Sequence, residues 1–516
     1  MMGKIEIQKI TDNVQALLGQ KKLDTAMAVL KRTQKEIPNH PLITFQLGYV
    51  LFLKNNLEEA EYYLEITLQK IPILPGLIET LIAVYQNLGK SQKATQLLKK
   101  ALIWGPKKIN LILEYADLLH SKQSFELALF YYKRASTIDP METRAQANIA
   151  ESLTELQRPD EALSFIEMAL LRNPSSKQLA LNKALTLLSL KKYKEGWHAY
   201  EARLSGEIDE APKRLINITR WAAQSLTNKA ILVCSEQGVG DELLFSAYLP
   251  KLAPLAKRII VETDPRLVAL FSRSFEDFEI HPYSRRLSGT RVIYDYHWLK
   301  QCRTYPDLFV EVASLPYFLK ETHKEPVAIT PHLKDDTNAT KVWTNRLKKM
   351  SDGKPLIGLF WRSGLYTNSR KHFYPTIDLW QPILSLKNVT FLSLQYDDDS
   401  HDISLAKQLF GVNILKVEGI NLRDDLDEIA SLCKALTGVI SPSTTTAHLS
   451  GCMGTKTIII DRTTNWSPKI NNFDAVLPSI QHIFPPQVGD WNWVFKKARS
   501  VAQGWIQDEI HDQIIP

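Results

Sequence analysis

Cysteine is scarce in this sequence. The chain has 516 residues and 4 cysteines, with neither a CxxC pair nor a zinc-finger spacing among Cys234, Cys302, Cys433 and Cys452. Isolated thiols in a chain of this length are typical of a reducing compartment. The pattern therefore argues against a disulfide framework and favours a cytoplasmic protein.

Long apolar runs and concentrated charge are also missing. No run is long enough to cross a bilayer, and the first 20 residues lack the apolar core of a signal peptide. The net charge is +7, without a dense block of Lys or Arg. We expect a soluble protein with no membrane span and no nucleic-acid partner. The weak positive charge suits anionic ligands such as nucleotide phosphates, but an ordinary, slightly basic surface explains it equally well.

What the sequence does contain is a repeat in its first 205 residues. Prolines recur every 34 residues, at Pro38, Pro72, Pro106, Pro140 and Pro174. Alanines recur with the same step, at Ala26, Ala60, Ala94, Ala128 and Ala162, and Gly196 is next in that series. A unit of this length holds two short amphipathic helices, in which the small residue lets the helices approach closely and the proline follows the second one.

The pattern resembles the tetratricopeptide repeat, over about residues 10 to 205. Such units stack into a superhelix with a concave groove, which favours a protein or peptide partner. The alternative is that the array only spaces or dimerises the chain. The last unit, YKEGWHAYEARL at 193–204, departs from the pattern, and we interpret it as a cap or a junction.

The rest of the chain has a different periodicity. Short apolar runs that read as strands alternate with amphipathic stretches, at 230–234, 258–263, 278–283, 291–296, 355–361, 389–396, 437–441 and 456–461. Strand–helix alternation predicts parallel sheets, and hence two doubly wound, Rossmann-like α/β domains across a cleft. The predicted organisation is a repeat solenoid at 1–205, a linker at 206–228, and α/β domains at 229–350 and 351–516.

The turn after the first of these strands is a candidate site. In CSEQGVGDELLF, Gly238 and Gly240 allow the backbone to approach a ligand, and Asp241 lies near a helix start that favours anions. The pattern is not GxGxxG, so it is a weak dinucleotide signal. Asp241 is interpreted either as a helix N-cap or as a general base directed into the cleft.

A second candidate follows the strand at 437–441, in SPSTTTAHLSGCMG. A helix that begins at about residues 444–446 would present free backbone N–H groups beside the hydroxyls of Thr444 and Thr445, which is a phosphate cradle. His448, one turn on, could add a donor. The alternative is a Ser/Thr N-cap with a core histidine. The acidic YDDDS at 396–400 is interpreted as a turn, and no metal role is expected for it.

Together these segments resemble a known combination: bacterial tetratricopeptide-repeat proteins fused to a heptosyltransferase-like GT-B glycosyltransferase, more distantly similar to O-linked N-acetylglucosamine transferases. The resemblance is carried by EQGVGDELLFSAYLPKLA, VEVASLPYFL, GLFWRSGLYTNSRKHFYPTIDLWQPIL, FLSLQYDD and SPSTTTAHLSGCMG. Each piece is loose, but the ordered set spans nearly the whole chain.

The resemblance implies a GT-B fold with an acceptor domain followed by a donor domain that binds a nucleotide-sugar. Asp241 would be the base of a metal-independent, inverting transfer, with Gly238 and Gly240 in the loop on the acceptor side. No metal or other cofactor is expected. The implied donor-binding residues are Arg362, Arg370, Lys371, Ser443, Thr444, Thr445 and His448.

Two departures from the family pattern lie near the implied donor pocket. Ser443 stands where relatives usually have Asp, and TTNWSPKI at 463–470 stands where they often have Trp-Arg-Trp. Two hypotheses follow. One is a glycosyltransferase whose acceptor could be a protein held by the repeats. The other is an inactive repeat scaffold with a vestigial nucleotide-sugar site. The sequence identifies neither the donor nor the acceptor, the stereochemical outcome or the oligomeric state.

Overall fold

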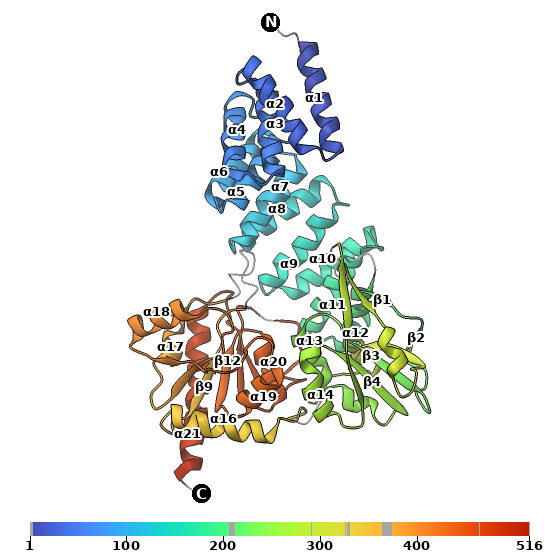
Figure 1. Cartoon of the computed structure of the whole chain (residues 1–516), viewed down its shortest axis with the longest axis vertical. Helices are drawn as coiled ribbons and strands as arrows, with labels where there is room; N and C mark the ends of the chain where they lie inside the picture. The colour runs from blue at the N-terminus through green and yellow to red at the C-terminus, as the bar shows by residue number, and fades with distance from the viewer. Residues whose placement is uncertain are drawn as a thin grey trace. The chain divides into compact units, whose positions relative to one another are not determined.

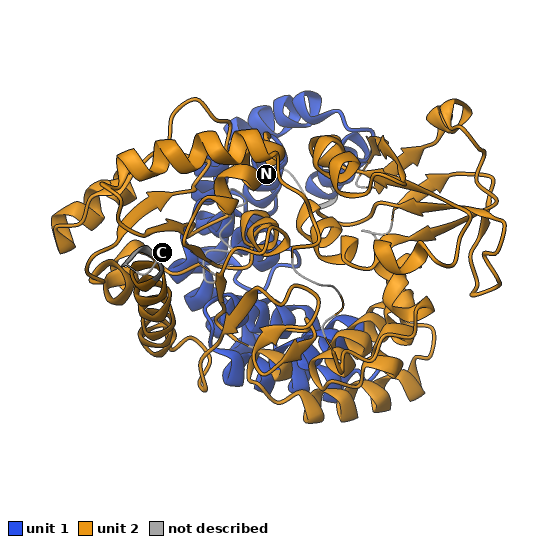
Figure 2. Ribbon diagram, turned by 90° about the horizontal axis from the view of Figure 1, so that it is seen from below, with its two compact units in different colours: residues 1–152 blue, residues 153–516 orange. Residues whose placement is uncertain are grey.

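The computed structural model describes residues 4–205, 212–289, 291–325, 327, 331–363, 374–463 and 465–514 (Figure 1). It divides into two compact units, Met1–Ser152 and Leu153–Pro516 (Figure 2). The boundary falls inside one helix, α9.

The first unit is built from helical hairpins. Its helices are α1 (Lys4–Gly19), α2 (Leu23–Glu36), α3 (Pro41–Leu53), α4 (Leu57–Lys70), α5 (Leu77–Asn87), α6 (Ser91–Trp104), α7 (Ile109–Ser121), α8 (Phe125–Ile138) and most of α9 (Thr143–Glu155). The second unit begins with further helices of the same kind: α10 (Pro159–Arg172), α11 (Lys177–Ser189) and α12 (Tyr193–Tyr200).

The 34-residue pattern has the expected cause. The repeated alanines lie on α2, α4, α6, α8 and α10, and each is fully buried. The repeated prolines come two residues after the ends of the same helices. Gly48 shows how tight the helix contact is, since a Cβ there would lie 2.6 Å from Cγ of Leu64. The predicted tetratricopeptide array is confirmed.

The second unit continues with a five-stranded parallel sheet. Its strand order is β2 (Thr219–Arg220), β8 (Leu308–Glu311), β3 (Ala230–Cys234), β4 (Arg258–Thr263) and β5 (Glu279–Pro282). Every residue of β3 is buried, as expected for a short apolar run inside a covered parallel sheet. The helices α13 (Val239–Ser246) and α14 (Val268–Ser274) follow β3 and β4.

One predicted strand belongs elsewhere. The run at 291–296 was expected to continue the alternation, but β7 (Arg291–Asp295) pairs antiparallel with β6 (Ser284–Ser288) and parallel with β1 (Lys213–Leu215) in a separate three-stranded sheet. The position beside β3 is taken by β8, whose segment the sequence analysis had not assigned to a strand. A tight hairpin between β6 and β7 explains the difference, because strands that are consecutive in the sequence usually lie next to each other.

A second, eight-stranded sheet forms the remainder. Its order is β11 (Ile414–Leu415), β10 (Thr390–Ser393), β9 (Leu356–Leu359), β12 (Gly438–Ser441), β13 (Thr457–Ile460), β16 (Ile480–Ile483), β15 (Phe473–Asp474) and β14 (Lys469–Ile470). The first six strands are parallel and the last two pair antiparallel. Its helices are α16 (Thr337–Met350), α17 (Gln381–Leu384), α18 (Ser400–Phe410), α19 (Leu426–Lys434), α20 (Thr445–Cys452) and α21 (Trp491–Ile514). The predicted pair of Rossmann-like α/β folds is confirmed.

Chain order reverses at one point in each sheet, between β8 and β3 and between β9 and β12. Ligands of open α/β sheets bind outside the carboxyl ends of the strands at such reversals. The turn from β3 to α13 and the turn from β12 to α20 both start at these points. None of the described helices is long and apolar enough to cross a membrane.

Candidate functional site

The two turns singled out in the sequence meet. A Cβ on Gly240 would lie 3.5 Å from Cδ2 of His448 and 3.8 Å from Oγ1 of Thr445, so α13 and α20 pack start to start. Further along the same helices, the thiol of Cys452 donates to the carbonyl of Leu243 at 3.6 Å. Because Gly240 has no side chain, the backbone of the first α/β fold can lie directly against the second.

Beside this contact is a cavity of about 400 Å³. Of the predicted site residues, Asp241, Ser443 and His448 line it, whereas Thr444 and Thr445 are not among its lining residues. The described residues that line the cavity are Asp241, Leu244, Tyr374, Pro442, Ser443, His448, Ile460, Asp461, Arg462, Thr463, Asn465, Trp466, Ser467 and His482.

Asp241 lies in the first turn of α13 but is not its N-cap. That position belongs to Gly238, which has an extended backbone, and the helix begins at Val239. Asp241 reaches back instead, and its Oδ2 accepts the N–H of Gly238 at 3.2 Å. Burial raises the pKa of Asp241 to about 6, against the hydrogen bond from Gly238 and with help from the charge of Glu236. A carboxyl of this pKa, exposed to a cavity, is suited to accept a proton near neutral pH.

The Glu236 carboxylate that faces Asp241 is itself fixed in place. Arg203, from the short helix η1 (Glu201–Leu204), donates from Nε and Nη2 to its two oxygens at 3.1 and 2.6 Å. The N–H of Ala313 adds a third bond at 3.0 Å. Both side chains are almost fully buried, so the pair rigidly holds the turn that carries Asp241.

The start of α20 agrees with the sequence prediction in its position. Thr444 is the N-cap; its Oγ1 accepts the N–H of Ala447 at 3.3 Å and lies 2.9 Å from Oγ of Ser441. The helix begins at Thr445. The N-cap interpretation of the threonines therefore holds for Thr444. This cap does not exclude an anion at the same helix end, because the backbone N–H groups in the first turn of a helix have no partner within the helix.

His448 is half-buried at the cavity wall. Its Nε2 lies 3.4 Å from Oγ of Ser443, while the buried Nδ1 has no hydrogen-bond partner among the described residues. Burial lowers the pKa of His448 to about 4, although the charges of Asp474 and Asp461 oppose the shift. The ring is therefore neutral at physiological pH, and it can offer one N–H to a ligand.

Of the three predicted cations, the structure describes only Arg362. Arg362 does not line the cavity: its Nε pairs with Asp397 at 3.1 Å, and its Nη1 pairs with Asp402. The acidic stretch after β10 thus serves in part to hold this arginine. Arg370 and Lys371 lie outside the described residues.

A cation that the sequence analysis missed does line the cavity. Arg462 lies two residues after the end of β13, is almost fully buried and forms an ion pair with Glu155. Burial lowers the pKa of Arg462, opposed by Glu155. The available signal was its position, since DRTTNW comes at the carboxyl end of the buried strand TIII, where parallel sheets carry their ligands.

A buried histidine between two carboxylates forms another wall. His482 of β16 places Nδ1 3.2 Å from Asp461 and Nε2 3.0 Å from Asp474. Burial alone would lower the pKa of His482, but the hydrogen bonds to both aspartates raise it. The same contact helps to lower the pKa of Asp474 against its own burial. Asp461 and His482 both face the cavity.

The TTNWSPKI departure has a clear structural role. Trp466 stacks on Phe245 and Tyr200, with ring centroids 6.4 and 6.0 Å apart. Lys469 holds the loop from beneath, donating to the carbonyls of Asn465 and Ser467 at 3.2 and 2.9 Å. Burial lowers the pKa of Lys469 to about 8. Trp466 thus forms part of the cavity wall, together with Asn465 and Ser467 of the same loop.

Comparison with known proteins finds relatives of the chain but no family model. No family model matches the chain. Protein FlbA from Caulobacter vibrioides is 27% identical over 462 residues, which cover 88% of this chain and 77% of that protein. BBSome complex member BBS4 from Bos taurus is 25% identical over 189 residues, 37% of this chain and 36% of BBS4. A solved tetratricopeptide repeat protein from Parabacteroides merdae, 16% identical, covers 37% of this chain and 76% of its own, with a TM-score of 0.33. The chain is thus similar to FlbA over most of its length.

Proposed function

We propose that the chain is a glycosyltransferase that moves a sugar from a nucleotide-sugar to an acceptor hydroxyl. The observation that carries the proposal is the meeting of the two turns: Gly240 lies against His448 and Thr445 at the edge of a cavity that exposes Asp241. A carboxyl able to take a proton thus lines the same cavity as Ser443, which leads into a helix start able to hold an anion.

In the proposed reaction the oxygen of the acceptor hydroxyl attacks the anomeric carbon of the donor sugar. Asp241 takes the proton from that hydroxyl in the same step. The bond from that carbon to the nucleotide diphosphate breaks on the opposite face, so the configuration is inverted. The leaving diphosphate carries the electron pair, and its charge is stabilised by the N–H groups at the start of α20, the hydroxyls of Thr444 and Thr445, and the Arg462 guanidinium. We propose no metal for this step.

The repeats support a protein or peptide as the acceptor. Stacked helical hairpins expose extended surfaces suited to a peptide, and α10–α12 belong to the same compact unit as the cavity. We therefore propose that the array presents an acceptor chain to the transferase half, in the cytoplasm.

A second candidate is a binding scaffold without transfer activity. The specific observation in its favour is Arg362, whose guanidinium is held by Asp397 and Asp402 outside the lining of the cavity. Such a protein would bind the nucleotide part of the donor and leave the sugar in place.

A thermal-shift series followed by a transfer assay tests both. A ligand that binds only the folded chain raises the melting temperature by mass action. We expect one nucleotide series to do so with the wild type, and Thr445→Ala and His448→Ala to lose most of the shift. With that donor, Asp241→Asn should keep the shift but lose transfer by at least about 100-fold.

The matched control is Asp277→Asn, since Asp277 is exposed and lies outside the cavity. It should behave as the wild type. A donor shift without transfer by the wild type, across the acceptors tried, would favour the scaffold. If no nucleotide shifts the wild type while a known nucleotide-binding protein responds, both versions of the proposal fail.

A further inference from the structure

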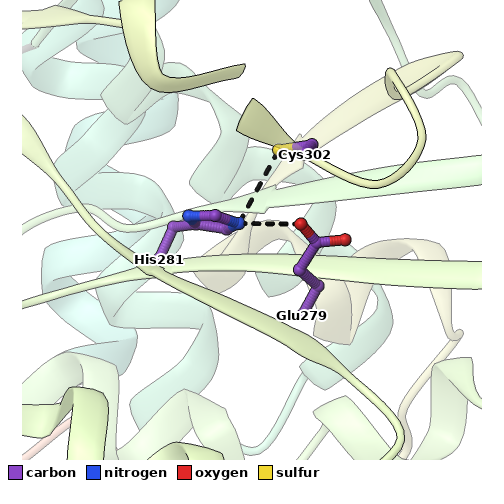
Figure 3. A group of neighbouring side chains, drawn as sticks. All are labelled: Glu279, His281 and Cys302. Atoms are coloured by element: carbon purple, nitrogen blue, oxygen red, sulfur yellow. Dashed lines mark hydrogen bonds and ion pairs between the residues drawn. The ribbon is translucent and has the colours of Figure 1, made fainter. Parts of the chain in front are cut away.

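Three side chains of different ligand types converge at the edge of the five-stranded sheet (Figure 3). Glu279 and His281 are two residues apart on the edge strand β5, and so they share one face of it. Cys302 comes directly after the short helix η4 (His297–Gln301). The three ligand atoms lie within 4.8 Å of one another.

Their hydrogen bonding is incomplete as it stands. Nε2 of His281 is 3.0 Å from Oε1 of Glu279 and 3.7 Å from Sγ of Cys302. That nitrogen can either donate a proton to the carboxylate or accept one from the thiol, but it cannot do both. Oε2 of Glu279 is buried, and no described residue donates a hydrogen bond to it. The cluster thus leaves one buried carboxylate oxygen without a donor among the described residues.

A metal ion would satisfy all three ligands at once. For tetrahedral zinc with ordinary bond lengths, the ligand atoms should be about 3.4 Å (N to O) and about 3.6 Å (N to S) apart. The measured separations of 3.0 and 3.7 Å differ from these by less than half an ångström. We propose that Glu279, His281 and Cys302 form a zinc site, completed by one water molecule.

The surroundings orient the ligands as a metal site requires. The ring of His281 stacks on Trp298, with centroids 4.7 Å apart and planes 23° apart. The N–H of Arg303 donates to Oε1 of Glu279 at 3.1 Å, and Arg258 lies 3.9 Å from the other oxygen. Such outer contacts fix the rotamers of metal ligands. A thiolate and a carboxylate also balance the charge of Zn²⁺, and sulfur with nitrogen favours zinc over the oxygen-loving cations.

The site would lock a small part of the fold. Glu279 and Cys302 are 23 residues apart, and the hairpin of β6 and β7 lies between them. A bridging ion closes this loop and ties the three-stranded sheet to the edge of the parallel one, as a cross-link does. None of the three ligands lines the cavity around Asp241, so the zinc site is separate from the proposed transfer.

Cobalt titration of the chelator-treated full chain tests the site. Co²⁺ bound by a thiolate shows a sulfur-to-metal absorption in the near ultraviolet and strong visible bands when tetrahedral. We expect one equivalent to give these bands in the wild type and Zn²⁺ to abolish them. Cys302→Ser should lose the sulfur band, and His281→Gln should bind at least about tenfold more weakly. His297→Gln is the matched control, an exposed histidine in the adjacent η4 that should change nothing.

Thiol labelling of the unaltered protein gives a second, independent readout. Cys302 is half-buried whereas Cys234, Cys433 and Cys452 are buried, so Cys302 should react first and Zn²⁺ should protect it. The proposal is overturned if the wild type shows no cobalt–sulfur band, if Cys302→Ser keeps it, or if zinc leaves the labelling rate unchanged. Labelling decides the question even if a variant fails to fold. Neither a positive nor a negative result of the zinc experiments changes what is expected of the thermal-shift series with nucleotides.

Discussion

Cδ2 of His448 lies 3.5 Å from the point that a Cβ on Gly240 would occupy. This is an ordinary van der Waals separation, so one methyl group fits and a larger side chain does not. The contact joins α13 and α20, the helices that start at the reversal points of the two sheets. The size of side chain that position 240 accepts can be measured. It underlies the first prediction.

Gly240→Ala should fold normally and keep the nucleotide-induced shift in melting temperature, because the added methyl only touches the imidazole. Gly240→Val should lose most of that shift, because its second methyl group forces α13 and α20 apart. Thermal unfolding with and without nucleotide measures both. Equal ligand shifts for the valine and alanine variants would show that the contact does not shape the cavity.

The pKa of Asp241 sets a pH limit for transfer. Since burial raises that pKa to about 6, the base is protonated below pH 6 and ionised above it. The transfer rate at low donor concentration should fall about tenfold for each pH unit below 6 and level off above it. The pH–rate profiles of the wild type and Asp277→Asn should both show this fall below pH 6, the acidic limb. The residual activity of Asp241→Asn should lack it. An acidic limb that survives in Asp241→Asn assigns the limb to another group.

The His482–Asp474 pair should stabilise the fold within a defined pH window. The pKa of His482 is raised above 6.5, so its contribution is complete below that value and is lost as pH rises through the folded pKa. The pKa of Asp474 is lowered below 3.8, so its contribution is complete above that value and is lost in acid. The coupling is therefore largest between about pH 4 and 6.5.

A double-mutant cycle of His482→Gln and Asp474→Asn in urea measures this coupling. Breaking one partner of the buried pair at pH 5.5 should cost about 3–5 kcal/mol. The coupling should shrink at pH 9. The same coupling energy at both pH values would mean that the imidazole is neutral throughout.

Two helical glycines should respond to alanine in opposite directions. A Cβ on Gly196 in α12 would lie 2.8 Å from Cδ2 and 3.2 Å from the backbone nitrogen of Leu188, so Gly196→Ala should destabilise the chain by about 1–3 kcal/mol. Gly504 in α21 has nothing within 4 Å of that position, so Gly504→Ala should stabilise it by about 0.5–1 kcal/mol. Urea unfolding of the two variants checks both signs. A stabilising Gly196→Ala would mean that α11 and α12 separate easily.

The sequence was sufficient for features that depend on local pattern. The recurrence of residues such as Ala60 and Pro72 every 34 residues predicts the helix pairs, because burial and helix ends recur with the repeat. The apolar run of β12 followed by hydroxyls predicts the start of α20. In both cases the evidence lies within a few turns of chain.

Features that depend on distant partners were not predictable in this way. Nothing local indicates that Arg362 is held by Asp397 and Asp402, or that Arg462 pairs with Glu155. Likewise β7 has the apolar, β-branched composition of a parallel strand, and only its pairing with β6 removes it from that sheet. Glu279, His281 and Cys302 have no metal-finger spacing, because two of them share a strand and the third returns after a hairpin.

The stacking of Trp466 on Tyr200 has a consequence for how such chains can be rearranged. Tyr200 is the last residue of α12, and Arg203, just beyond it, holds Glu236. Cutting the chain after residue 205 would therefore remove an aromatic wall and an ion pair from the α/β half. Because Glu155 also pairs with Arg462 at the cavity, duplication or loss of repeats during evolution, or module exchange in the laboratory, can act freely only upstream of Glu155. The segment from Glu155 to Arg203 therefore has to stay with the α/β half.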